Sequence, residues 1–217
     1  MTLIFCSSAR EVVIEELSFT NLLEQDFKWP KMGDKLFSQG EPAYGACLSR
    51  HPGERLYQLI EGYKLAADLL VEQGEDEAWR RRKLVYPIVF CYRHFLELTL
   101  KAMLDEYGEM ANISPNWSHH RLENLWNDFR ALLRNLGSDQ PEDDGTEAVE
   151  RCIAEFAKID PSSLTFRYPI DKKGQSFDVD HEMIDLLLLR DTIQAIENYF
   201  VGCDGFLNEM KGAQPGW

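Results

Sequence analysis

The chain has 217 residues, of which 44% are hydrophobic and 12% aromatic; this composition indicates one good-sized globular domain and excludes a disordered chain. Its 37 acidic residues outnumber 23 basic residues, for a formal net charge of −14. Because nucleic-acid binding is driven by neutralisation of phosphates, this balance excludes a broad basic surface. Nucleic acid could bind only at a local basic pocket or with a partner's help. The acidity is more simply explained as charge that maintains solubility.

The sequence also predicts a cytoplasmic protein without a membrane segment. Charged residues interrupt every long apolar run before about 18 residues, so no transmembrane helix is expected. The first residues, MTLIFCSSAREVV, lack the basic region and the long apolar core of a secretory signal. The cysteines are odd in number and scattered, without a CxxC pair, so we expect reduced thiols and no disulfide framework. They are Cys6, Cys47, Cys91, Cys152 and Cys203.

Apolar residues recur three and four positions apart through most of the chain, which predicts an all-α, single-domain, up-and-down bundle of about six helices within residues 1–217. Gly74, Gly137 and Gly202 follow periodic stretches and are expected to end helices. Pro87 either kinks a helix or begins a new one. In chain order, the expected helices cover about 9–26, 53–73, 75–106, 118–136, 145–159 and 180–201.

Two stretches with little periodicity, residues 29–48 and 160–178, predict long ordered loops. In the first, Trp29, Phe37 and Tyr44 are expected to anchor the loop on the core. Ser118 is expected to cap the helix over 118–136. The helix over 180–201 contains four consecutive leucines, which cannot all face one way, so it should be buried on most sides.

A basic run, Arg80 to Lys83, follows the acidic residues Glu75 to Glu77. The spacing of four residues between Asp76 and Arg80, and between Glu77 and Arg81, suits ion pairs along one helix. These pairs would account for part of the basic run locally. A nucleic-acid patch is the less favoured interpretation of this segment.

The stretch LVYPIVFCYRHFLELTLKAML, residues 84–104, is the most apolar long run, yet it carries four ionisable side chains. On a helix with about 100° per residue, these side chains share one arc of roughly 100°. Such a helix belongs in the middle of a bundle with one polar window. The window is either a structural charge ladder, in which Glu97 pairs with Arg93 and Lys101, or a site in which Arg93 stabilises phosphate charge and His94 moves a proton.

The sequence gives only weak signals for a metal site or for other catalytic motifs. His119 and His120 are adjacent, so their side chains point about 100° apart and would not easily hold one metal ion. The Cys and His spacings match no zinc pattern, and His181-Glu182 is too isolated for a metalloprotease motif. There is no glycine-rich phosphate loop, nucleophile elbow or dinucleotide fingerprint. No metal site and no cofactor is expected.

Arg167 and Tyr168 lie in the second long loop, between Phe166 and Pro169. Phe166 can anchor the loop on the core, and Pro169 fixes the backbone after it. A loop held on both sides can deliver an arginine to a fixed point. The alternative is a surface arginine beside packed aromatic residues.

Three segments together resemble the HEPN superfamily, the higher eukaryotes and prokaryotes nucleotide-binding domain. They are RHFLELTLKAML (93–104), HRLENLWNDF (120–129) and FRYPID (166–171), in this order. The resemblance covers about residues 53–200 and leaves residues 1–52 as an N-terminal extension. It implies an α-helical bundle, commonly dimeric, that acts in bacterial defence, stress or RNA processing, either as a metal-independent ribonuclease or as a non-catalytic module that binds nucleotides or RNA.

In catalytic HEPN domains an arginine is followed, after four to six residues, by a histidine. Here the positions that follow Arg93 at this spacing are Leu98, Thr99 and Leu100, and none of them is a histidine. No histidine of the chain is preceded by an arginine at the required distance. Thus either His94 or His120 substitutes from another position, or the protein is a non-catalytic relative.

The resemblance makes a homodimer that binds or cleaves RNA or nucleotides the first expectation for function. Arg93 and His94 would be catalytic. The binding residues would be Glu97, Lys101, His120, Arg167 and Tyr168. The alternative is a non-catalytic scaffold subunit that binds a protein partner. If Arg93 opens onto a solvent cleft with His94 and Arg167, the nuclease gains support, and if Arg93 is buried on Glu97, it loses support.

Overall fold

The computed structural model describes residues 28–38, 44–137, 144–177 and 183–213. The chain divides into two units, Met1–Cys47 and Leu48–Trp217. In the first unit, the predicted helix over residues 9–26 lies outside the described residues. The predicted anchoring of Trp29, Phe37 and Tyr44 on the core stays a prediction, because these residues belong to the first unit and the core to the second.

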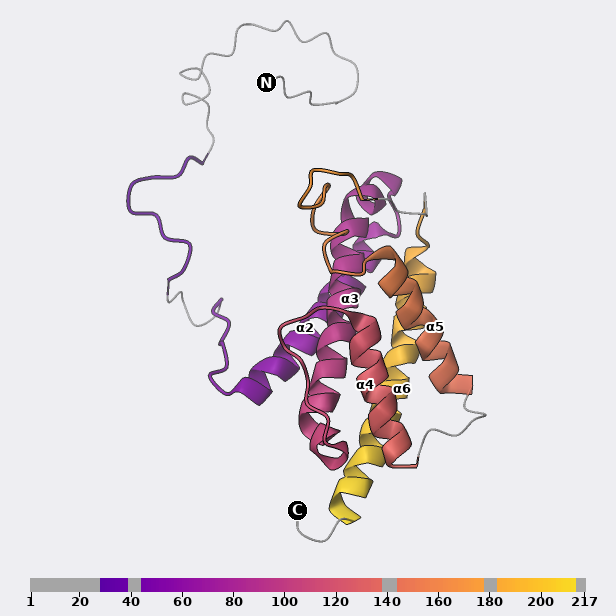
Figure 1. The fold of residues 1–217 in the computed structure, drawn as a ribbon. Helices are drawn as coiled ribbons and strands as arrows, with labels where there is room; N and C mark the ends of the chain where they lie inside the picture. Colours follow the sequence, from indigo (N-terminus) through magenta and orange to yellow (C-terminus); the bar gives the residue numbers. More distant parts are fainter. Residues whose placement is uncertain (1–27, 39–43, 138–143, 178–182, 214–217) are drawn as a thin grey trace, which may run out of the picture. The chain divides into compact units, whose positions relative to one another are not determined.

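The second unit is all-α across its described residues, which confirms the predicted fold class (Figure 1). It contains five α-helices and one short 3-10 helix. A single β-bridge between Ile170 and Ser176 lies within the loop that precedes the last helix. The elements are α2 (Pro52–Gly74), α3 (Ala78–Tyr107), η1 (Gly108–Ala111), α4 (Leu122–Asn135), α5 (Asp144–Ile159) and α6 (Leu186–Ala213).

The helices α2 and α3 form an antiparallel hairpin (Figure 1). Pro52 occupies the first turn of α2, where its missing N–H costs no hydrogen bond. The prediction that the next helix begins at Glu75 is wrong, because α3 begins at Ala78 and Glu77 precedes it in extended backbone. Pro87 lies inside α3, and the helix continues through it.

The connection from α3 to α4 differs from simple up-and-down order. The segment of residues 112–121 runs back beside α3, so that α3 and α4 point the same way (Figure 1). Its course is marked by Trp117, whose ring faces the Lys101 amine at 5.6 Å, and by His120, which reaches Glu97 one turn earlier on α3. The predicted start of α4 is also wrong: Ser118 bonds to Asn116, and the helix begins at Leu122.

Helix α6 was expected over 180–201 and instead spans Leu186–Ala213. Asp185 sets its start, because one carboxylate oxygen accepts hydrogen bonds from the N–H groups of Leu187 and Leu188, both at 3.0 Å. Gly202 does not end the helix. Leu187 and Leu188 are 46% and 65% exposed, so the prediction that α6 is buried on most sides is wrong too.

Helix α3 lies at the centre of the core, as its sequence predicts. Every residue from Ile88 to Leu104 is buried or partly buried. The surrounding helices contribute one apolar face each, and aromatic rings fill the space between α4 and α6, where Phe129 and Phe200 meet edge to face at 5.7 Å. A polar group on α3 is therefore removed from water unless a neighbouring segment leaves a gap.

Gly108, at the junction of α3 and η1, provides a test of this packing. A β-carbon there would lie 2.3 Å from the Ile113 carbonyl oxygen. That carbonyl belongs to backbone that is fixed, because the Ile113 N–H donates to the Gly108 oxygen at 2.8 Å. We expect Gly108→Ala to lower the free energy of unfolding by about 1–3 kcal/mol, measured by urea denaturation.

The matched control is Gly62→Ala in the exposed middle of α2. An added β-carbon at Gly62 meets nothing within 4 Å. Alanine is the better helix former by about 1 kcal/mol, so this substitution should stabilise the protein. Equal effects of the two substitutions would contradict the tight contact at Gly108.

Candidate functional site

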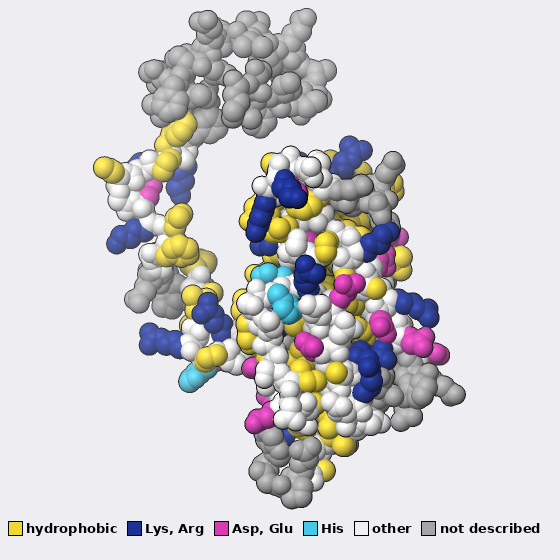
Figure 2. Space-filling view, viewed as in Figure 1, with side chains coloured by type: hydrophobic (Ala, Val, Ile, Leu, Met, Phe, Trp, Pro, Cys, Tyr) yellow, Lys and Arg dark blue, Asp and Glu magenta, His cyan; other side chains and the backbone are white. Residues whose placement is uncertain are grey.

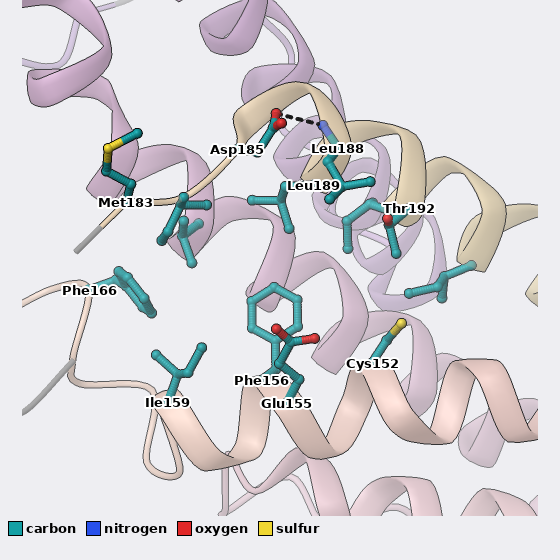
Figure 3. Close-up of a pocket in the computed structure, with 14 residues that line it drawn as sticks. Cys152, Glu155, Phe156, Ile159, Phe166, Met183, Asp185, Leu188, Leu189 and Thr192 are labelled. Carbon is teal, nitrogen blue, oxygen red and sulfur yellow. Dashed lines mark hydrogen bonds between the residues drawn. The ribbon is translucent and has the colours of Figure 1, made fainter. Parts of the chain in front are cut away.

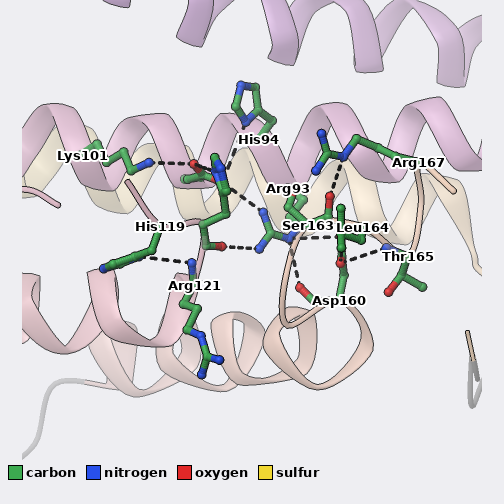
Figure 4. Close-up of polar contacts among 12 residues, drawn as sticks. Arg93, His94, Lys101, His119, Arg121, Asp160, Ser163, Leu164, Thr165 and Arg167 are labelled. Atoms are coloured by element: carbon green, nitrogen blue, oxygen red, sulfur yellow. Dashed lines mark hydrogen bonds and ion pairs between the residues drawn. The ribbon is translucent and has the colours of Figure 1, made fainter. Parts of the chain in front are cut away.

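Glu97 is the centre of the polar window on α3. Its side chain is only 1% exposed, and its two carboxylate oxygens receive bonds from three side chains. Oε1 accepts hydrogen bonds from Lys101 Nζ and His120 Nδ1, both at 2.8 Å. Oε2 accepts one from Arg93 at 3.1 Å. The carboxylate therefore joins two turns of α3 to the segment that leads into α4 (Figure 4).

Arg93 is fully buried and binds three separate parts of the fold. Besides Glu97, its guanidinium donates to the backbone carbonyl oxygen of His120 at 2.6 Å and to that of Asp160 at 3.2 Å. The Asp160 carboxylate lies 3.3 Å from the same Nε. Arg93 thus cross-links α3, the segment before α4 and the segment after α5, and each of its three guanidinium nitrogens donates to a protein oxygen.

Asp160 is the part of this network that the sequence analysis missed. Its side chain is 1% exposed. One carboxylate oxygen accepts hydrogen bonds from the N–H groups of Leu164 and Thr165, at 2.7 and 3.1 Å, while the other faces Arg93. The signal that could have revealed it is an aspartate directly after a periodic helix and before Pro-Ser-Ser, the setting in which Asp side chains organise turns.

The buried network carries two acidic and two basic side chains, so its formal charge is balanced. Burial by itself raises the pKa of the Glu97 carboxyl, but the neighbouring His94, Lys101 and His120 outweigh it and hold its pKa well below the ordinary 4.5. Burial lowers the pKa of Arg93, and the carboxylates of Asp160 and Glu97 oppose this shift. Arginine remains charged at neutral pH, so the pairing is ionic.

The two predicted histidines lie at the edge of the network. His94 is 22% exposed, and its Nδ1 is 3.9 Å from Glu97, too far for a hydrogen bond. Its ring stacks on Phe90 at 5.6 Å and meets the edge of Tyr63 at 4.5 Å. His120 is 51% exposed on its side chain while its Nδ1 is bonded to Glu97. His119 points elsewhere, toward the backbone N–H of Arg121.

Arg167 and Tyr168 lie on the outer side of α3 and do not bind Glu97. The Arg167 Nε donates to the Ser163 carbonyl oxygen at 2.5 Å. Its guanidinium lies over the rings of Phe90 and Tyr168, at 5.6 and 5.5 Å. The loop thus places Arg167 on the surface beside aromatic rings, as in the second of the two interpretations of this loop, and separate from the buried Arg93 (Figure 4).

The structure therefore brings together five of the predicted site residues and sets two apart. Arg93, Glu97, Lys101, His120 and, at longer range, His94 form one network. Arg93 is fully buried whereas Arg167 is exposed, so the two arginines do not share a solvent-facing position. Of the two outcomes expected for Arg93, burial on Glu97 is the one that the geometry meets, which weakens the support for a nuclease. No group of three or more metal-ligating side chains occurs within the described ranges.

An apolar cavity of about 270 Å³ lies apart from the network, between α5, α6 and the loop after α5 (Figure 3). Phe156, Ile159 and Phe166 line one side, and Leu188 and Leu189 the other. Sequence analysis did not identify this cavity, since its lining comes from segments separated along the chain.

Comparisons with known proteins add no assignment: no family model, no curated protein and no solved structure matches the chain. No helix in the described part of the chain combines the length and the apolar character needed to cross a membrane. Fold and site define an all-α protein with a buried, charge-balanced network at its centre and aromatic and basic side chains at its outer edge.

Proposed function

We propose that this chain is a HEPN-like module that binds RNA or nucleotides and has no ribonuclease activity of its own. The observation that carries the proposal is the full burial of Arg93, whose guanidinium is bonded to Glu97, Asp160 and the backbone of His120. The resemblance of three segments to HEPN proteins supports the class of ligand.

Metal-independent RNA cleavage needs a group that moves the 2′-hydroxyl proton and a cation that stabilises the charge developing on the phosphate. Arg93 cannot approach a phosphate without breaking bonds to buried acceptors, and each unsatisfied acceptor costs about 1–3 kcal/mol. His94 is held between Phe90 and Tyr63, with Nδ1 toward Glu97. The supported role of the network is to fix the helices that carry the exposed residues.

His120, Arg167 and Tyr168 remain as ligand-facing candidates, because each reaches the surface. In this proposal the protein is a cytoplasmic homodimer that takes part in bacterial defence or stress responses. Its contribution there is to hold RNA or a nucleotide. Any cleavage would be supplied by another component.

The test is an RNA assay with purified protein in the presence of EDTA. We expect no cleavage by the wild type above the level of His94→Ala, and binding of labelled RNA or nucleotide detected by fluorescence anisotropy. Cleavage that His94→Ala or His120→Ala abolishes would contradict the non-catalytic assignment. Equal cleavage by wild type and both variants would indicate a contaminating nuclease.

The apolar cavity favours a second candidate, a scaffold subunit that binds a protein partner. Its lining is mostly aliphatic and aromatic, and Leu188 at its rim is 65% exposed. If this candidate is right, the wild type binds neither RNA nor nucleotides, and Leu188→Lys changes the assembly state measured by light scattering. Under the first proposal, Leu188→Lys retains RNA binding.

A further inference from the structure

One face of α3, outside the buried network, carries three aromatic side chains and one basic side chain. Trp79, Lys83, Tyr86 and Phe90 follow one another at intervals of four, three and four residues. At about 100° per residue these positions share an arc of some 60°. Trp79 and Tyr86 are 54% and 55% exposed, and Phe90 is partly buried. Large rings this exposed contribute little to the core, so their placement calls for another explanation.

Cations accompany these rings. The Lys83 amine lies 4.8 Å from the centre of the Trp79 ring, and the Arg80 guanidinium lies 5.5 Å from it. At the other end, Arg167 is placed over Phe90 and over Tyr168, which is 53% exposed. Trp79, Lys83, Tyr86 and Phe90, with Arg167 and Tyr168 from the loop, are called the α3 stripe below.

The two parts of the α3 stripe are joined through Phe166. Its ring lies 6.3 Å from that of Tyr86, and its side chain is 7% exposed, so the core fixes the loop beside α3. The stripe spans the twelve residues from Trp79 to Phe90, or about 17 Å along the helix, before the loop extends it.

The local charge of this surface is opposite to that of the chain. Residues 79–90 contain four basic residues and no acidic residue, in a protein of net charge −14. Arg80 pairs with Glu77, and Arg81 donates to two backbone carbonyls. Arg82 and Lys83 are exposed and form no ion pair with any described residue. Figure 2 shows basic side chains gathered at the end of the bundle where α3 begins.

We propose that the α3 stripe is a binding surface for single-stranded nucleic acid, which rests on the proposed function and specifies its ligand and its position. The exposed rings of Trp79, Tyr86 and Tyr168 stack with unpaired bases, while Lys83, Arg82 and Arg167 neutralise the phosphates between them. Proteins that bind single strands without sequence preference combine these two elements, because every base has a face that can stack.

The alternatives fit less well. A duplex hides the faces of its bases, so the exposed rings would have nothing to stack on. An acidic peptide would use the cations and leave the rings unused. A helix that lies on a membrane separates an apolar face, with Trp, Phe and Leu, from a polar face with Lys and Arg. In the α3 stripe, Lys83 instead shares one arc with the rings of α3. The charge contrast and the aromatic spacing both favour a single strand.

The experiment measures binding of a fluorescein-labelled single-stranded RNA of about 20 nucleotides to the full chain by anisotropy. Trp79→Ala and Tyr86→Ala should each weaken the affinity about tenfold, the loss expected when one stacked base loses its ring. Affinity for RNA falls as salt rises, and the slope of log affinity against log salt concentration reports the number of phosphate contacts. Lys83→Ala should reduce the magnitude of this slope by about 0.7, the value for one phosphate contact of a single strand.

Matched controls use exposed side chains of the same kind elsewhere. Trp117 and Tyr57 are 49% and 64% exposed, and the side chain of Arg151 is 81% exposed. Their alanine variants should bind RNA like the wild type. Far-UV circular dichroism of every variant checks that the helices remain.

The outcomes separate the two levels of the proposal. If the wild type binds single-stranded RNA and the three stripe variants bind equally well, the α3 stripe is not the site, although the proposed function stands. If duplex RNA, heparin or anionic vesicles compete as well as single-stranded RNA, the stacking role is overturned. If the wild type binds no RNA or nucleotide, the proposed function itself fails. A parallel titration with single-stranded DNA shows whether binding depends on the 2′-hydroxyl group of the ribose.

Discussion

Replacing Glu97 with alanine is expected to remove about 3–5 kcal/mol of stability, the usual result of breaking a buried ion pair from one side. The side chain is 1% exposed and is bonded to Arg93, Lys101 and His120. Its loss leaves Arg93 and Lys101 charged within the bundle without their shared partner. Since a domain of this kind is stable by only about 5–15 kcal/mol, the variant should unfold at a much lower urea concentration.

The matched control is Glu147→Ala. Glu147 also pairs with an arginine one helical turn away, Arg151 at 3.4 Å, but the two side chains are 58% and 81% exposed. An exposed pair contributes between nothing and about 1 kcal/mol. Similar losses for the two variants would show that burial of the Glu97 network has no special effect on stability.

The pKa of Glu97 adds a dependence on pH. Because its folded-state pKa lies below its ordinary value of 4.5, the unfolded chain binds a proton at Glu97 before the folded chain does. The stabilisation from Glu97 is therefore complete above pH 4.5 and is lost progressively as the pH falls further. Glu97→Gln should lose less stability than the wild type between about pH 4.5 and pH 3, whereas Glu147→Gln should follow the wild type.

Most of the fold could be predicted because apolar spacing reports which face of a helix is buried. The bounds of α2 and α5 agree with prediction to within a residue or two. The failures occur at helix ends, where a particular side-chain bond or a contact with the core decides the boundary. Ser118 bonds to Asn116 instead of capping α4, and α6 passes Gly202 because Phe200 and Leu207 on either side of it pack into the core.

The site shows the same limit. Spacing along α3 correctly predicted that Glu97 joins Arg93 and Lys101, since partners four residues apart on one helix can be inferred from sequence. It could not reveal Asp160, 67 residues from Arg93, or the role of the His120 carbonyl. It could not decide whether Arg93 faces solvent either, because that depends on where residues 112–121 return along α3.

The basic run on α3 illustrates why a total charge is a poor guide to one surface. Pairs of Asp76 with Arg80 and of Glu77 with Arg81 were expected to account for it, but Glu77 pairs with Arg80 and Arg81 binds backbone oxygens. Lys83 has no acidic partner among the described residues, and its amine lies over the Trp79 ring. A net charge of −14 and a local cationic surface coexist, since residues 79–90 contain four basic residues and no acidic residue.

The second large effect is expected from Arg93→Lys, which retains the charge but not the geometry. The planar guanidinium donates to Glu97, Asp160 and the His120 carbonyl at once. The compact ammonium group of lysine cannot reach all three of these acceptors. At least one buried acceptor should lose its donor, at a cost of about 1–3 kcal/mol for each, measured by urea denaturation. Arg151→Lys, at an exposed position, is the control and should change stability by less than about 0.5 kcal/mol.

Hydrogen exchange distinguishes a structural from a catalytic Arg93. If Arg93 holds the fold together, Arg93→Lys should speed exchange at the amides of Leu164 and Thr165, which bond to Asp160, while the middle of α2 keeps its protection. The folded variant should still bind single-stranded RNA through the α3 stripe with little change. If Arg93 instead served catalysis, exchange and stability would stay near wild type and only RNA cleavage would fall. The bonds of the guanidinium to three segments favour the first result, because a side chain that joins three parts of the fold cannot be altered without loosening them.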